Sequence, residues 1–128
     1  MAYPTGSGSE VLKRTTINAL ADTATAFRWD GTMATTGTST YTVPALHIIT
    51  VLSVIFCDQA NESDDTNMYI YDGANNIYLM QSQTIGAFGT FAWNDKFVLI
   101  GGDKLIVQST SGATQDVSCH YIDQNWEN

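Results

Sequence analysis

The amino-acid sequence predicts an all-β protein: an antiparallel β-sandwich, jelly-roll-like or immunoglobulin-like, with about eight strands and an extended N-terminal arm. Apolar and polar residues alternate with a period of two along much of the chain. Residues that favour strands (Thr, Tyr, Val and Ile) are abundant. Turn signals rich in Gly and Asp separate the apolar runs. The 128 residues suffice for one domain with a buried core.

Residues 1–22 are expected to form the arm, and residues 23–128 the sandwich domain. The first 40 residues hold three acidic and three basic residues and are rich in Gly, Ser and Thr. Such a polar start buries too little apolar surface to offset the entropy of ordering it. We therefore expect the arm to become ordered only against a partner. The arm residues expected to contact that partner are Tyr3, Val11, Leu12, Lys13, Arg14 and Ile17.

Alternation within the domain predicts a series of strands. Their apolar positions are, in chain order, Phe27 and Trp29, Tyr41 and Val43, Met68 and Ile70, Phe91 and Trp93, and Val117, Cys119 and Tyr121. Residues 48–56 are apolar at both parities, which indicates a strand covered on both faces, either centrally in the sandwich or by another subunit. Residues 16–26 are the one segment expected to form a short helical turn.

No set of residues typical of catalysis is present, so we expect a protein without enzymatic activity, metal or cofactor. A metal-binding jelly roll needs several imidazoles that converge on one ion, but His47 and His120 stand alone and are expected at an edge or on the surface. Cys57 lies in an apolar run that disfavours its thiolate. Cys57 and Cys119 are expected to be reduced, with one bridge between neighbouring strands as the alternative.

The acidic segment 58–65 is a candidate calcium loop. An EF-hand loop that starts at Asp58 needs Gly at its sixth position and Glu at its twelfth, but the sequence has Ser63 and Tyr69 there. The segment is therefore expected to be a solvated loop between two strands, with a looser calcium site as the alternative.

Tyr69 and Tyr71 have the same parity and are expected to share one face of a strand. Such a face could contact a glycan, because sugar rings stack on aromatic side chains, or it could contact another subunit, because subunit interfaces are rich in Tyr. Packing in a subunit interface or against a second sheet is the expected role.

The net charge is −8, with thirteen acidic and five basic residues, which disfavours binding to nucleic acids and to membrane surfaces. The most apolar stretch is too short for a membrane-spanning helix. The N-terminal residues do not have the pattern of a secretory signal, so we expect no export.

Four segments resemble the small β-sandwich virion proteins of tailed bacteriophages. They are T-V-P-A at residues 42–45, N-D-K-F-V-L at 94–99, G-D-K-L-I-V at 102–107 and the closing strand D-V-S-C-H-Y-I at 116–122. The resemblance extends over residues 40–122. It implies a structural protein of the phage particle, assembled in the host cytoplasm, without catalytic activity.

Within that group the resemblance allows two positions in the particle. The expected one is a capsid decoration (cement) protein, a homotrimer that binds the major capsid protein or other virion proteins partly through its arm and stabilises the head. The alternative is a neck, tail or fibre component, which contacts a host surface glycan. Because the acidic body gains nothing by facing packaged DNA, an exterior position is expected.

Overall fold

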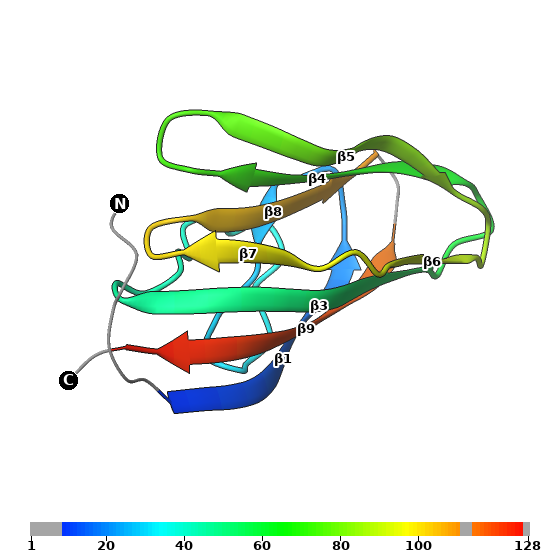
Figure 1. The fold of residues 1–128 in the computed structure, drawn as a ribbon. Coiled ribbons are helices and arrows are strands. Elements are labelled where there is room, and N and C mark those ends of the chain that lie inside the picture. Colours follow the sequence, from blue (N-terminus) through cyan, green and yellow to red (C-terminus); the bar gives the residue numbers. More distant parts are fainter. Residues whose placement is uncertain (1–8, 111–113, 127–128) are drawn as a thin grey trace.

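The computed structural model describes residues 9–110 and 114–126, which form two antiparallel β-sheets packed face to face, without a helix (Figure 1). In chain order the strands are β1 (Ser9–Leu20), β2 (Thr25–Ala26), β3 (His47–Asp58), β4 (Asp64–Tyr71), β5 (Asn76–Ile85), β6 (Thr90–Trp93), β7 (Phe97–Ile100), β8 (Lys104–Ser109) and β9 (Gln115–Asn125). None of the described residues belongs to a helix long and apolar enough to cross a membrane.

The strand order confirms the predicted β-sandwich and makes it jelly-roll-like. One sheet has the order β1-β9-β3-β6, with β7 also on β3, and the other has the order β2-β8-β4-β5. β6 pairs with one end of β3 and β7 with the other, so they act as a single interrupted edge strand. Each sheet then has four strand positions, and the first strand pairs with the last, as in a jelly roll.

The hydrophobic core lies between the two sheets and is built from alternate residues of their inner faces. β3 contributes Ile49, Val51, Val54 and Phe56, each fully buried. Other members come from β1, β4, β5, β7, β8 and β9: Ile17, Leu20, Met68, Met80, Ile85, Leu99, Leu105, Val107, Val117, Cys119 and Tyr121. Each large apolar side chain buried in this way stabilises the fold by about 1.5–3 kcal/mol.

Residues 9–20 correct the expected division into arm and domain, because they form β1, an edge strand of the five-stranded sheet (Figure 1). β1 runs antiparallel to β9, and Ile17 and Leu20 are buried in the core. The partner that orders this segment is thus the chain's own last strand, which supplies the backbone hydrogen bonds that a polar segment lacks by itself. The expected helical turn at 16–26 is wrong. Residues 1–8, with Tyr3, lie outside the described residues.

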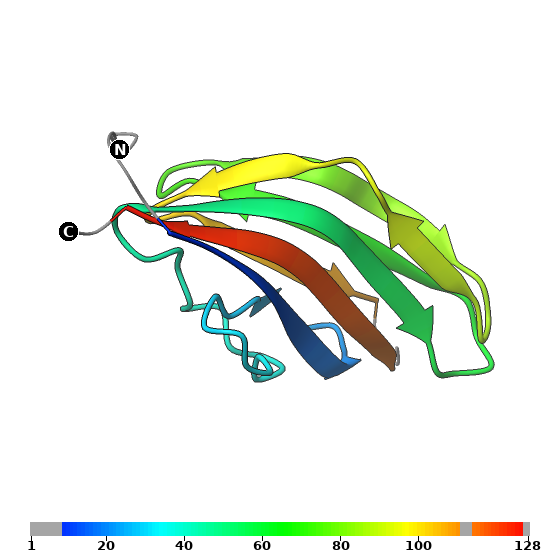
Figure 2. The ribbon, with the colours of Figure 1, turned by 60° about the horizontal axis from the view of Figure 1, so that its bottom comes forward.

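The connection between β2 and β3 is irregular, although strands were expected around Phe27–Trp29 and Tyr41–Val43. Phe27, Trp29 and Val43 are buried here, so their alternation reflects a loop that packs against the core. Trp29 meets Tyr121 edge-to-face at 4.9 Å between ring centroids. Figure 2 shows this segment, in cyan, folded beside β1, and Ala34 N donates to Thr16 O (2.8 Å).

Candidate functional site

The five-stranded sheet has one surface that faces away from the core, which we call the outer face. Strand register aligns its side chains in rows across the sheet. In one row Leu12 on β1 pairs with Ile122 on β9, which pairs with Thr50 on β3, which pairs with Val98 on β7. A neighbouring row contains Ile48 and Ile100, and a further row contains Thr16, Ser118, Ile55 and Ala92. Figure 2 shows β1, β9 and β3 side by side in this sheet.

The outer face carries several apolar side chains that are incompletely covered. Leu12 is 71% exposed and Val98 51% exposed, while Ile48, Leu52 and Ile55 are partly exposed. The apolar residues at both parities of 48–56 are thereby explained. One parity fills the core, and the other lies on the outer face, where nothing in the described chain buries it fully. Exposed apolar side chains grouped on one surface are a common feature of interaction sites.

Few charges lie on the outer face. The charged side chains in its rows are Glu10 and Arg14 on β1 and Asp116 at the start of β9. At its centre His120 contacts two hydroxyl groups, Ser53 Oγ at 3.1 Å from Nδ1 and Ser118 Oγ at 3.1 Å from Nε2. For a chain of net charge −8, this is a surface of low charge density.

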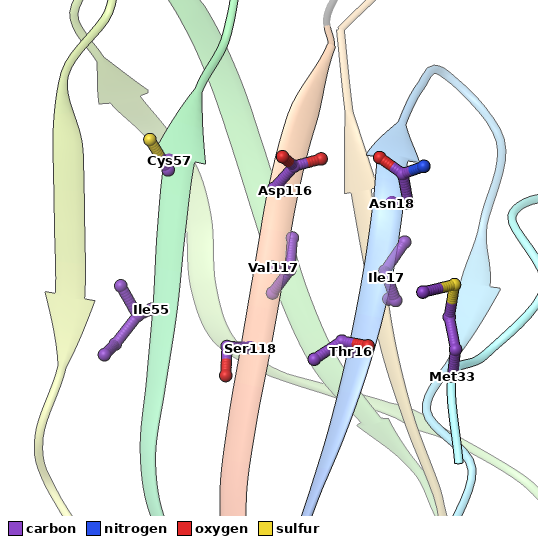
Figure 3. Close-up of a pocket in the computed structure, with 9 residues that line it drawn as sticks. All are labelled: Thr16, Ile17, Asn18, Met33, Ile55, Cys57, Asp116, Val117 and Ser118. Carbon is purple, nitrogen blue, oxygen red and sulfur yellow. The ribbon is translucent and has the colours of Figure 1, made fainter.

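A shallow hollow of about 370 Å³ lies at the end of the outer face where β1 ends and β9 begins (Figure 3). Cys57, Asp116 and Asn18 lie in one row across β3, β9 and β1. Ile55, Ser118 and Thr16 form the next row across the same three strands. Cys57 Sγ accepts a hydrogen bond from Gln59 Nε2 (3.2 Å), and an amide is not a general base. Asp116 Oδ1 accepts from the Ala19 N–H (3.1 Å), which holds the bulge that ends β1. In this hollow the Cys57 thiol therefore has an amide, and not a base, as its hydrogen-bond partner.

The two histidines lie apart, and His47 is mostly covered and does not stand alone. His47 Nδ1 is 2.7 Å from Asp123 Oδ1, and Lys13 Nζ donates to Asp123 Oδ2 at 3.0 Å. Asp123 is 4% exposed. Because Lys13, His47 and Asp123 lie on β1, β3 and β9, this cluster links the three strands at one end of the sandwich. Among the described residues, no group of three or more His, Cys, Asp or Glu side chains is arranged to hold a metal ion.

The two cysteines are both free thiols. Cys119 is fully buried on the inner face, and burial raises the pKa of its thiol far above the usual range. Cys57 is partly exposed on the outer face, beside Asp116 in the register. The bridge between neighbouring strands that the sequence left open is therefore not formed.

The two tyrosines of β4 pack within the protein and do not present a pair of free rings, which was the alternative to the packing role expected for them. Tyr69 is only 8% exposed and packs against Tyr78 at 4.9 Å between ring centroids. Burial raises its pKa. Tyr71 donates its hydroxyl hydrogen bond to Gly73 O (3.1 Å), and Lys104 Nζ lies 5.4 Å from the centre of its ring. Both rings contribute to a small cluster with Ala26 and Ile106 on the outside of the four-stranded sheet.

The structure places the predicted arm residues in different environments. Val11 and Leu12 are largely exposed, Arg14 is exposed, Lys13 is held by Asp123, and Ile17 is buried in the core. Sequence reasoning missed Ile122 and Val98 on the outer face, because only strand order brings them beside Leu12. The signal that was available is the second apolar parity of residues 48–56.

No family model matches the chain, and no curated protein matches its sequence. Among solved structures, a chain of the Bacillus endospore appendages, described as a family of disulfide-linked pili, is similar with a TM-score of 0.52 and 16% identity over 99% of this chain and 97% of that chain. A chain of the virus-like particle of Macrobrachium rosenbergii extra small virus has a TM-score of 0.46 and 9% identity, over 100% of this chain and 86% of that chain. A chain of infectious bursal disease virus has a TM-score of 0.43 and 10% identity, over 94% and 38%. The likeness to the pilus chain shows a shared fold.

Proposed function

We propose that this protein is a non-enzymatic structural subunit that attaches to a larger protein assembly through its outer face. The observation that carries the proposal is the row Leu12, Ile122, Thr50 and Val98, which places apolar side chains from three strands on a surface left open by the described chain. Covering an apolar side chain such as Leu12 or Val98 stabilises a contact by up to about 1.5–3 kcal/mol.

In its finer form, the assembly is the head of a tailed bacteriophage, and the protein is a capsid decoration protein that stabilises the lattice. The resemblance of residues 40–122 to small virion proteins supports this form. The charge distribution agrees with it, because the acidic body is repelled by packaged DNA and by anionic membranes. The partners are then the major capsid protein or other virion proteins, and the protein resides in the virion after assembly in the host cytoplasm.

The N-terminal half of β1, at the edge of the sheet, adds a second contact. Residues 9–14 form the outermost strand of the sheet, and Val11, Leu12 and Arg14 are exposed there. An edge strand presents unpaired backbone groups to which a neighbouring chain can add a strand. A homotrimer would combine three such contacts and raise the attachment strength through effective concentration. Its closed symmetry fits a three-fold position of a lattice.

The experiment compares two outer-face variants with a matched control. Leu12→Glu and Val98→Glu each place a charge on the outer face, whereas Ile77→Glu places one at a similarly exposed apolar site on β5, in the other sheet. Co-sedimentation with heads of the phage that encodes the chain, assembled without it, should fall at least about tenfold for the two outer-face variants. The control should bind like the wild type. Equal binding by all four proteins contradicts attachment through the outer face.

The alternative position, in the neck, tail or fibre, differs in copy number. Quantitative mass spectrometry of purified virions should find this chain at a copy number comparable with that of the major capsid protein if it decorates the head. A few copies per particle would move it to the neck, tail or fibre, where a host glycan could be the partner. Absence from virions contradicts both positions.

A further inference from the structure

One end of the sandwich core consists of polar side chains, although these are as little exposed to solvent as the apolar core. Five side chains there are less than 5% exposed and come from the inner faces of both sheets: Asp58, Asp64, Thr66, Ser109 and Gln115. Asp58 and Gln115 are register partners on β3 and β9, and Thr66 and Ser109 are register partners on β4 and β8. Thr66 Oγ1 donates to Gln115 Oε1 at 3.0 Å, which joins the two sheets at this point.

Each carboxyl group accepts a protein hydrogen bond with one oxygen, and the two carboxyl groups also contact each other. Asp58 Oδ1 accepts the Ala60 N–H (2.8 Å), and Asp64 Oδ1 accepts the hydroxyl of Thr110 (3.2 Å). Asp58 Oδ2, Asp64 Oδ2 and Ser109 Oγ are buried and have no hydrogen-bond partner in the protein, and the same holds for Gln115 Nε2. Buried polar atoms are almost always paired, and unpaired buried charge is costly. Unpaired buried atoms on four residues that are neighbours in the strand register therefore indicate an occupant between them, either a cation or a proton shared by the two carboxyl groups.

The electrostatic surroundings are negative. The ion pairs among the described residues involve Asp30 and Asp123, and none reaches Asp58 or Asp64. Burial raises the pKa of Asp64, a hydrogen bond from Thr110 opposes this, and the neighbouring Asp58 and Glu62 raise it further. The strand pairing also brings the two carboxyl groups together, because Asp58 is the register partner of Gln115, and Gln115 accepts from Thr66, two residues after Asp64 on β4. Two carboxylates that share a dry site need a cation or a proton between them.

We propose that a calcium ion binds between Asp58 and Asp64, with the free Oδ2 atom of each carboxylate and the Ser109 hydroxyl as protein ligands. Oxygen-only donors exclude a preference for Zn²⁺, which favours nitrogen and sulfur. Ca²⁺ accepts an irregular oxygen shell completed by water, whereas Mg²⁺ demands near-ideal octahedral geometry. The Gln115 amide nitrogen can donate to a water of that shell.

The ion would connect the end of β3, in one sheet, to the start of β4 and the end of β8, in the other sheet. It would therefore stabilise the packing of the two sheets at this end. The site lies on the inner faces, away from the outer face, so it does not depend on the proposed attachment. A shared proton between the two carboxyl groups and a buried water molecule are the competing occupants.

The test uses the full-length protein freed of metal with a chelator. Isothermal titration calorimetry with CaCl₂ at neutral pH should saturate at one ion per chain, and saturating Ca²⁺ should raise Tm by about 4 °C or more. MgCl₂ at the same concentration should give less than half that shift. Asp58→Asn and Asp64→Asn should each weaken Ca²⁺ binding at least about tenfold. Asp95→Asn, which changes an exposed carboxylate in the β6–β7 connection, should bind Ca²⁺ like the wild type.

Several results would overturn the proposal. The absence of heat and of a Tm shift in the wild-type protein excludes the ion, whatever the variants do. Undiminished Ca²⁺ binding by both Asn variants places the ion elsewhere. Stability that rises as the pH falls, without any response to Ca²⁺, assigns the space between the carboxyl groups to a proton.

Discussion

Lys13 on β1 donates to the carboxylate of Asp123 on β9 at 3.0 Å, across the edge of the five-stranded sheet. Asp123 is 4% exposed and has His47 on its other oxygen at 2.7 Å, so the carboxylate is held by two strands at once. The Lys13 side chain is 29% exposed, which leaves the pair only partly screened by water. This contact fastens the half of β1 whose other side chains remain exposed.

Replacing Asp123 by Ala should destabilise the protein by about 2–4 kcal/mol, because it leaves Lys13 and His47 without their shared partner in a largely buried place. Urea unfolding followed by tryptophan fluorescence measures the change. Asp30→Ala is the matched control, since the Arg28–Asp30 pair is much more exposed. Because Asp30 also accepts the Thr32 N–H at 3.1 Å, this control should cost about 1 kcal/mol. Equal losses for the two variants would show that the Asp123 cluster adds nothing beyond a surface ion pair.

Truncating Ile17 tests whether β1 is part of the core. Ile17 is 1% exposed, and Ile17→Ala should cost about 2–5 kcal/mol through lost burial and the cavity that remains. Leu12→Ala, on the same strand but 71% exposed, should change the free energy of unfolding by less than about 0.5 kcal/mol. A small effect at both positions, measured by denaturant unfolding, would restore the view of residues 9–20 as a detachable arm.

The contrast between Ile17 and Leu12 also shows where the sequence was informative. Period-two alternation predicted the strands of the body and the fold class, because burial on one face leaves a local signature. It failed for residues 9–20, where the stabilising partner is β9, at the other end of the chain. It failed again for residues 27–29, where Phe27 and Trp29 pack into the core from a loop. In both cases the deciding contact is long-range.

Long-range strand pairing also decided which residues form the outer face and how the tyrosines of β4 pack. The two apolar parities of residues 48–56 predicted a doubly covered strand, and its outer parity now lies on the outer face. Ile122 and Val98 join that face only through the pairing of β9 and β7 with β3, which no local pattern encodes. Tyr69 and Tyr71 do share a face, but the packing of Tyr78 on Tyr69 depends on the register of β5.

Tyr121 anchors the loop beside β1, because its hydroxyl oxygen accepts the Gly31 N–H at 3.1 Å. Gly31 has a φ of 81°, a conformation that favours glycine. Tyr121→Phe leaves the Gly31 amide without this partner and should cost about 1–2 kcal/mol by denaturant unfolding. Tyr71→Phe removes an exposed hydroxyl contact to Gly73 O and should be nearly neutral. A neutral Tyr121→Phe would mean that water replaces the hydroxyl without loss.

In the calcium-free protein, Asp64 should make the folded state more stable at low pH than at neutral pH. Its pKa is raised by burial and by Asp58, so the folded state holds a proton at pH values where the unfolded state has released it. That contribution to stability is present at low pH and is lost as the pH rises through the raised pKa of the folded state. Asp64→Asn removes the titration and should be more stable than the wild type at pH 7 without Ca²⁺, and this difference should shrink as the pH falls towards 4.

Urea unfolding at several pH values in the presence of a chelator measures this difference in stability, and Asp95→Asn serves as the control because its carboxyl group is exposed. A difference between Asp64→Asn and the wild type that stays constant with pH would show that the Asp64 carboxyl group titrates alike in both states.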